Sequence, residues 1–94
     1  MRFYWDPNKS RANLRKHGIS FETASQVFDD PNQLSIQDRF EDGEERWQTT
    51  GLINGITVLI VAHTVTSEDV EEVVRIISAR KATPLERRRY NEGI

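Results

Sequence analysis

The chain has 94 residues, of which 36% are hydrophobic and 30% charged, and it contains no cysteine. This length accommodates one modest core, so we expect residues 1–94 to form a single domain. The absence of cysteine excludes a disulfide framework and a thiolate zinc site. No apolar run approaches the roughly 18 residues of a membrane span, and the first residues lack the apolar stretch of a secretory signal. We therefore expect a cytoplasmic protein without a membrane partner.

The charged residues are distributed unevenly. Residues 1–17 carry five lysines and arginines and residues 75–89 carry six, whereas residues 18–74 carry two against twelve carboxylates. If the two ends meet in the fold, a basic surface opposite an acidic one would attract an anionic ligand, although the net charge is −2. Solvated helix faces would give the same pattern, and the sequence leaves both interpretations open.

The first third of the chain predicts a short strand and two helices. Residues 3–5 are strand-like, and Asp6-Pro7 supplies a helix cap followed by proline at the first helical position. This polar helix should end near His17, because Gly18 suits the left-handed conformation that closes a helix. A second helix should begin after Ser20, with apolar residues at helical spacing. These are Phe21, Ala24, Val27 and Phe28.

The middle of the chain predicts strands joined by tight turns. We expect strands over residues 34–40, 45–52 and 56–64, and Asn54-Gly55 is a strong signal for a two-residue hairpin. Residues 56–64 are apolar on both faces, which is typical of a central strand.

The segment that follows is ambiguous. Residues 70–77 would fit a helix capped by Ser67, but four β-branched residues within 73–77 favour a strand. Residues 83–86, Thr-Pro-Leu-Glu, combine a capping box with proline and predict a last helix. The order β-α-α-β-β-β-β-α predicts an α+β fold, an antiparallel β-sheet meander flanked by two N-terminal helices and a short C-terminal helix.

Two segments are specific in combination, Lys16-His17-Gly18 and residues 77–82, Ile-Ser-Ala-Arg-Lys-Ala. Further characteristic residues are Trp5, Asp6, Lys9, Asn13, Ser20-Phe21-Glu22, Val27-Phe28, residues 43–46, Gly51, Glu86-Arg87 and Tyr90. Together they resemble the BrnT family of toxins from bacterial toxin–antitoxin pairs, over nearly the whole chain. The resemblance implies a RelE-like fold and a ribonuclease that inhibits translation by RNA cleavage.

The resemblance also implies a partner. Toxins of this kind are neutralised by a cognate antitoxin, usually a ribbon-helix-helix DNA-binding protein, so DNA would be contacted only indirectly, through the antitoxin. The complex could contain the toxin as a dimer. Because inhibition commonly covers the basic site, we expect an antitoxin segment rich in Asp or Glu to lie across residues 75–90.

One position departs from the family pattern. Many relatives carry an arginine two positions after the threonine that ends the central strand, whereas here Thr64 is followed by Val65-Thr66. If that arginine holds the scissile phosphate, this chain cleaves poorly or uses another cation. The alternative function is therefore a catalytically weak or inactive RNA-binding or co-repressor protein that acts only with its antitoxin.

Metal-free RNA cleavage requires a base, an acid and a cation at one phosphate. Arg75 and Arg80 lie five positions apart, so on a regular strand they point to opposite faces. They can grip one phosphate only if the strand ends or bulges near Ser78. We favour Arg80 with Lys81 as the phosphate clamp and Arg75 as a salt-bridge partner.

Three further residues are catalytic candidates. Arg46 lies alone among acids, so it is either functional or paired with Glu44, Glu45 or a carboxylate on a neighbouring strand. Glu45 is a candidate general base. His17 is a candidate acid or base because histidine titrates near neutral pH, although a cation in the last turn of a helix also complements its dipole.

The remaining candidates concern RNA binding. We expect contacts from the basic ends of the chain and from one aromatic ring, namely Lys9, Lys16, Arg75, Arg88 and Tyr90. Tyr90 could stack on a base or anchor the last helix, and we favour anchoring. His63 shares a strand face with Leu59 and Val61, which predicts a hydrogen-bonded histidine in the core or at its edge. Neither histidine has a partner at metal-ligand spacing, so we expect no metal and no other cofactor.

Overall fold

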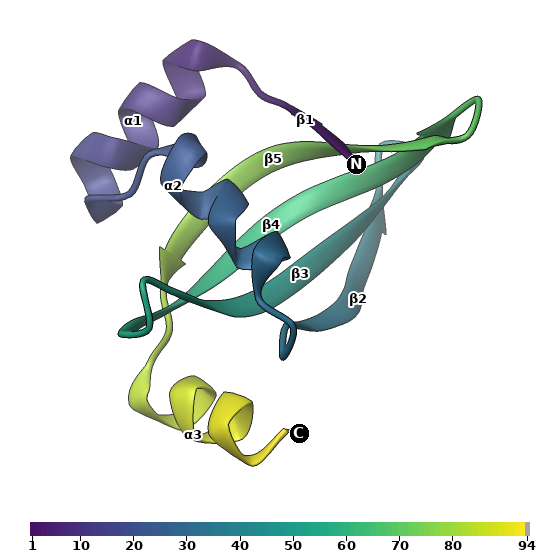
Figure 1. Cartoon of the computed structure of the whole chain (residues 1–94). Coiled ribbons are helices and arrows are strands. Elements are labelled where there is room, and N and C mark those ends of the chain that lie inside the picture. The colour runs from purple at the N-terminus through teal and green to yellow at the C-terminus, as the bar shows by residue number, and fades with distance from the viewer. Residues whose placement is uncertain (94) are drawn as a thin grey trace.

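The computed structural model describes residues 1–93 and contains five strands and three α-helices (Figure 1). The elements follow the predicted order, with one 3₁₀-helix, η1, added after α2. They are β1 (Arg2–Tyr4), α1 (Pro7–His17), α2 (Phe21–Ser25), η1 (Gln26–Asp29), β2 (Leu34–Glu41), β3 (Glu44–Ile53), β4 (Thr57–Glu68), β5 (Glu71–Lys81) and α3 (Pro84–Glu92).

The strands form one sheet in the order β1-β5-β4-β3-β2. Strands β2 to β5 are an antiparallel meander with β4 at the centre, as predicted, and the ambiguous segment is strand β5. The prediction of a purely antiparallel sheet is wrong, because β1 pairs with β5 in parallel, Phe3 opposite Val74. A three-residue strand carries no sequence pattern that reveals its direction. Its pairing is decided only when the chain returns through the meander.

The hydrophobic core lies between the sheet and the layer of α2 and η1, which cross one face of the sheet in Figure 1. Phe21, Ala24 and Val27 from this layer are fully buried against Leu59 and Val61 of β4. We call this side of the sheet the covered face and the opposite side the open face. Because side chains alternate along a strand, each strand divides its residues between the two.

The predicted helix ends are confirmed. The Asp6 side chain accepts a hydrogen bond from the Asn8 amide, and α1 ends at Gly18 with φ of 73°. Ser20 caps α2, and Thr83 and Glu86 form the capping box of α3. At the β3–β4 turn, Asn54 and Gly55 both have positive φ, as the hairpin signal requires.

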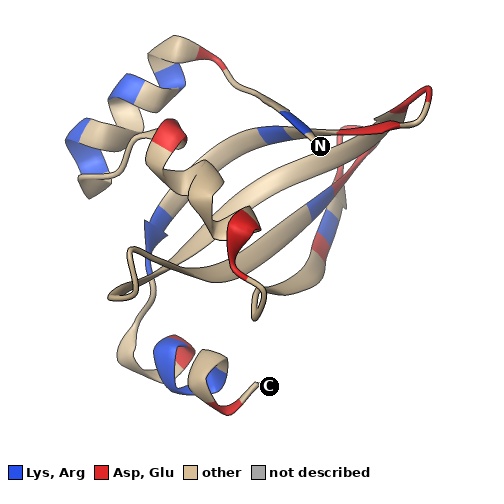
Figure 2. Ribbon diagram, in the orientation of Figure 1, with Lys and Arg blue, Asp and Glu red and all other residues tan. Residues whose placement is uncertain are grey.

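The charges are separated in space (Figure 2). Most acidic residues gather at the end of the sheet where the β2–β3 and β4–β5 turns lie, whereas basic residues line α1, the far end of β5 and α3, and a few acidic residues also lie on α2, η1 and α3. None of the helices within residues 1–93 is long and apolar enough to span a membrane.

Candidate functional site

A β-bulge in β5 decides which cations share the open face. Ala62 pairs with Ser78, but the next residue, His63, pairs with Ile76, so Ile77 is an extra residue without a partner on β4. The bulge reverses the alternation of side chains along β5. Arg75, paired with Thr64, and Arg80, paired with Ile60, therefore both project from the open face. The sequence allowed the two arginines to share a face only if the strand ended or bulged near Ser78, and the structure has such a bulge at Ile77.

Arg75 lies in a groove of about 470 Å³, which we call the Arg46–Arg75 groove. Its lining includes Tyr4, Trp5, Asp6, Lys9, Glu44, Arg46, Arg75 and Ile77. The Arg75 guanidinium lies 2.7 Å from the Glu44 carboxylate, and that of Arg46 lies 3.9 Å from the same carboxylate oxygen. The expected pairing of Arg75 is thus observed, and of the two interpretations left open for Arg46 the structure shows a long contact with Glu44. The groove therefore places three cations, Lys9, Arg46 and Arg75, around the carboxylates of Asp6 and Glu44.

Arg46 is the more enclosed of the two arginines. Its side chain is 18% exposed, and within residues 1–93 its Nε is a buried donor without a hydrogen-bond partner. Buried polar atoms are nearly always hydrogen-bonded, and an exception often marks the place of a water, an ion or a ligand. Because its contact with Glu44 is long and its buried Nε is unpaired within residues 1–93, the charge of Arg46 is only partly compensated, which suits an anionic ligand in the groove.

Helix α1 forms the flank of the groove because Asn13 fixes it to the edge of β5. The Asn13 amide donates to the carbonyl oxygens of Ile19 (2.8 Å) and Ala79 (2.9 Å), and it accepts from the Ala79 N–H (3.2 Å). Asn13 thereby satisfies the strand edge that β1 is too short to cover. This role of Asn13 was not predicted from the sequence. Asparagine is a poor helix former, so its presence in the interior of a helix could have indicated a side chain that hydrogen-bonds to the backbone elsewhere.

Arg80 is engaged by a carboxylate of its own. Its two terminal nitrogens lie 2.7 and 2.9 Å from the two carboxylate oxygens of Glu86 on α3. This bidentate pairing lowers the pKa of Glu86 to about 2 and raises the pKa of Arg80. Lys81 points to the covered face, because it pairs with Leu59. The structure therefore does not bring Arg80 and Lys81 together as one clamp, since neighbours on a strand alternate.

Glu45 lies on the covered face, as Trp47 does, and so on the side of the sheet opposite Arg46 and Arg75. Glu44, one position earlier, lies on the open face beside Arg46 and Arg75. The alternation rule applied to Arg46 would have identified it, because residues 44 and 46 share a face.

Helix α3 is attached to the body by polar contacts. It has no buried residue, and besides the Arg80–Glu86 pair, Arg87 donates to the Ile56 carbonyl (2.9 Å) and Tyr90 donates its hydroxyl proton to Asp30. Burial, reinforced by the Asp30 carboxylate, raises the pKa of Tyr90 to about 12.

The pKa of Asp30 shifts in the opposite direction. Burial acts to raise the pKa of Asp30, but hydrogen bonds from Tyr90, Leu52 and Asn32 outweigh it, so the pKa is lowered. The Tyr90–Asp30 contact agrees with the anchoring interpretation of Tyr90.

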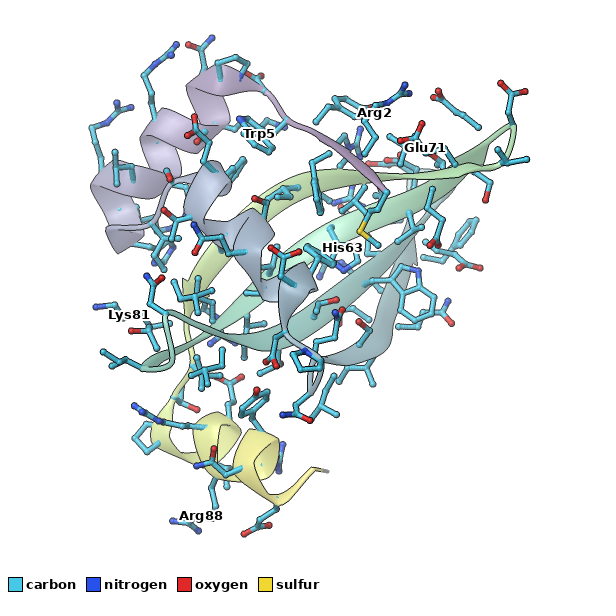
Figure 3. The ribbon with its side chains drawn as sticks, viewed as in Figure 1. Arg2, Trp5, His63, Glu71, Lys81 and Arg88 are labelled. Atoms are coloured by element: carbon cyan, nitrogen blue, oxygen red, sulfur yellow. The ribbon has the colours of Figure 1, made fainter. Side chains whose placement is uncertain are left out.

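Several basic candidates lie outside the groove. Lys16 is exposed on α1, and Arg88 points away from the sheet into solvent (Figure 3). Arg89, which the sequence analysis did not choose, lines a second hollow on the open face.

The two histidines differ in position. His17 is half-buried beside Ser78 and Arg80, at a small hollow of about 90 Å³. His63 is 2% exposed on the covered face, its Nε2 lies 2.7 Å from the Thr49 hydroxyl, and burial lowers its pKa. The core interpretation of His63 is confirmed.

Thr66 is the position at which the family resemblance leads us to expect an arginine. It pairs with Val73 and shares the open face with Thr64 and Arg75. A cation at this position would lie next to Arg75 along the same face. Within residues 1–93, no cluster of three or more metal-ligating side chains occurs.

Comparisons with known proteins agree with this fold. The family model for the ribonuclease toxin BrnT of type II toxin–antitoxin systems matches residues 5–86. The crystal structure of the ribonuclease toxin BrnT from Brucella abortus superposes with a TM-score of 0.69 at 21% sequence identity, covering 88% of this chain and 97% of that one. Comparison with curated proteins gives no match. Since the family model covers most of the chain, this protein belongs to the BrnT family of ribonuclease toxins of type II toxin–antitoxin systems.

Proposed function

We propose that this chain is a metal-independent endoribonuclease that inhibits translation, with the Arg46–Arg75 groove as its active site. One observation carries the proposal: guanidinium groups from two strands converge on a single carboxylate, Glu44, in an open groove. The planar fork of arginine pairs bidentately with phosphate and keeps its charge at all physiological pH values. Two such groups can stabilise the charge that develops on a phosphate during cleavage.

The residues of the groove suit a reaction of RNA with itself. A phosphate that enters between Arg46 and Arg75 competes with Glu44 for the guanidinium of Arg75. The freed Glu44 carboxylate takes the proton of the 2′-hydroxyl, the 2′-oxygen attacks phosphorus, and the bond to the 5′-oxygen breaks. Lys9, on the α1 flank, donates a proton to the leaving 5′-oxygen. The products are a 2′,3′-cyclic phosphate and a 5′-hydroxyl.

In this proposal Arg80 holds α3 against the sheet and is not the main phosphate-binding cation. Its guanidinium is bound on both nitrogens by Glu86, so RNA would have to displace a bidentate carboxylate to reach it. Arg46, by contrast, has a long contact of 3.9 Å with Glu44, so a phosphate displaces less to bind it. Metal independence is supported by the two arginines, which supply the charge that a metal ion supplies in other nucleases.

Cleavage of a labelled single-stranded RNA in EDTA tests the proposal. We expect purified protein to cut the RNA, and Arg46→Ala and Arg75→Ala each to lower the rate by about 100-fold or more. Arg15→Ala, which removes an exposed cation of α1, is the matched control and should retain activity. Stable RNA binding without any cleavage would refute the ribonuclease and support the co-repressor alternative. Inhibition of a cell-free translation reaction tests the second part of the proposal.

A toxin of a type II system acts together with an antitoxin. We propose that the cognate antitoxin is a ribbon-helix-helix protein, that DNA is bound only through it, and that the complex contains the toxin as a dimer. An acidic antitoxin segment suits the basic cluster of α1, the end of β5 and α3 (Figure 2). The complex should then weaken between 0.1 and 1 M salt, because the Debye length falls from about 10 Å to about 3 Å. Salt-independent binding would point to an apolar interface instead.

A further inference from the structure

The open face has a second hollow, of about 250 Å³, between α3 and strands β2 to β4. We call it the Gln48 hollow. Leu34, Ile36 and Ile60 give it apolar walls, Gln48 lies in its floor, and Tyr90 closes the side formed by α3. Apolar surface, an aromatic ring and a few hydrogen-bonding groups are the elements from which proteins build sites for unstacked nucleobases.

The hollow is in line with the Arg46–Arg75 groove. Arg46, Gln48 and Thr50 are alternate residues of β3 and project from the same face, about 6–7 Å apart in succession. The small hollow beside His17 shares Gln48 and Ile60 with the Gln48 hollow. An extended strand of RNA with its phosphate between the two arginines would therefore reach the Gln48 hollow with a nearby base.

The polar atoms of the floor are available to a ligand. Thr49 lies between Gln48 and Thr50, and its hydroxyl is hydrogen-bonded to Ser35 and His63. The side chains of Gln48 and Thr50, in contrast, take part in none of the side-chain hydrogen bonds among residues 1–93. The Tyr90 hydroxyl is bound to Asp30, which holds the ring in place against the hollow. Arg89 also lines the hollow and places a cation beside it.

We propose that the Gln48 hollow binds one unstacked base of single-stranded RNA next to the cleavage site, and that the Gln48 amide reads the edge of this base. The proposal deepens the ribonuclease function above and rests on it. A side-chain amide offers one acceptor and two donors, so it can pair with two atoms of a base and discriminate among the four. This makes Gln48 a specificity-determining residue.

The first test compares Gln48→Leu with Gln37→Leu. Gln37 is an exposed glutamine of β2 that pairs with Trp47 on the covered face, so it is a matched control outside the hollow. The measurement is kcat/KM on RNAs that differ in a single base near the cleavage site. We expect Gln48→Leu to reduce the preference at one position by about tenfold or more, while Gln37→Leu leaves it unchanged. An unchanged preference in Gln48→Leu, or its absence in the original protein, overturns the proposal.

The second test does not require cleavage. The four nucleoside 5′-monophosphates are titrated into ¹⁵N-labelled protein, with ribose 5-phosphate as the probe that lacks a base. We expect the side-chain amide signal of Gln48 to shift with one or two of the nucleotides and not with ribose 5-phosphate. Equal shifts with all five would mean that only phosphate is bound, and no shift would mean an occupant other than a base, such as an antitoxin side chain; either result overturns the proposal. If the signal of Gln48 shifts with particular bases but the protein does not cut RNA, the base-binding site is supported and the ribonuclease function is refuted.

Discussion

Arg75 and Arg80 project from the same face of β5 although five positions separate them, because Ile77 is bulged out of the pairing with β4. The two arginines nevertheless have different carboxylate partners. Arg75 pairs with Glu44 at the open groove, and Arg80 pairs with Glu86 and ties α3 to the sheet. In the proposed mechanism RNA competes for Arg75, the arginine nearer the acidic end of the sheet.

The position of Thr66 gives a prediction about activity. Thr66→Arg adds a cation on the open face, two residues along β4 from Thr64, the partner of Arg75. We expect it to raise kcat/KM for RNA roughly fivefold, the effect of about 1 kcal/mol in transition-state binding. Thr66→Ala is the control and should behave like the original protein. No gain in either RNA binding or cleavage would show that this position lies outside the path of the RNA.

The Arg80–Glu86 pair predicts a dependence of stability on pH. Because the pKa of Glu86 in the folded protein is about 2, below its ordinary value of 4.5, the ionised form stabilises the fold. This contribution is fully present above about pH 4.5 and is lost as the pH falls toward 2. We expect Glu86→Gln to lower the free energy of unfolding at pH 7 by about 1–2 kcal/mol, after allowance for solvent screening of a partly exposed pair.

The measurement for this pair is urea unfolding of both proteins between pH 2 and 7. The difference between them should shrink as the pH falls below 4.5. Glu92→Gln, on the exposed end of the same helix, is the matched control. A difference that stays constant across the whole range would mean that the ion pair does not stabilise the fold.

Tyr90→Phe should loosen the attachment of α3. The change removes the hydrogen bond to Asp30, which keeps its bonds from the Leu52 and Asn32 amides. We expect a loss of about 1–2 kcal/mol in the free energy of unfolding at pH 7. Since the pKa of Tyr90 is raised to about 12, its contribution is present below pH 10 and disappears as the pH rises toward 12.

Thermal unfolding at pH 7, together with the ultraviolet titration of tyrosine, measures this effect. In Tyr90→Phe the absorbance step near pH 12 should be absent. Tyr4→Phe, at a side chain 55% exposed, should leave the stability unchanged. Equal stabilities of the two variants would contradict the assigned role of the Asp30 contact.

Asn13→Ala should destabilise the flank of the groove. It leaves the N–H and carbonyl groups of Ala79 without partners at the edge of β5, where both are buried. We expect a cost of about 2–3 kcal/mol and faster hydrogen exchange at the Ala79 amide. Asn91→Ala, at an exposed position of α3, serves as the control. Unchanged exchange at Ala79 would mean that water replaces the lost amide without cost.

Local chemistry determined much of this protein from the sequence alone. The caps at Asp6, Ser20 and Thr83, the left-handed Gly18 and the alternation of apolar residues depend on near neighbours, so the elements could be placed before the fold was known. The family resemblance was carried by the same local segments, and the family model confirms it. The core position of His63 followed from strand alternation alone.

Only the tertiary structure decided the rest, because the deciding contacts join distant parts of the chain. The parallel pairing of β1 depends on the return of β5, and the bulge at Ile77 depends on its fit to β4. The bulge in turn set the face of Arg75, and the path into α3 set the partner of Arg80. A one-residue change of register exchanges the two faces of a strand, so no sequence pattern along β5 alone could show that Arg75 and Arg80 share a face.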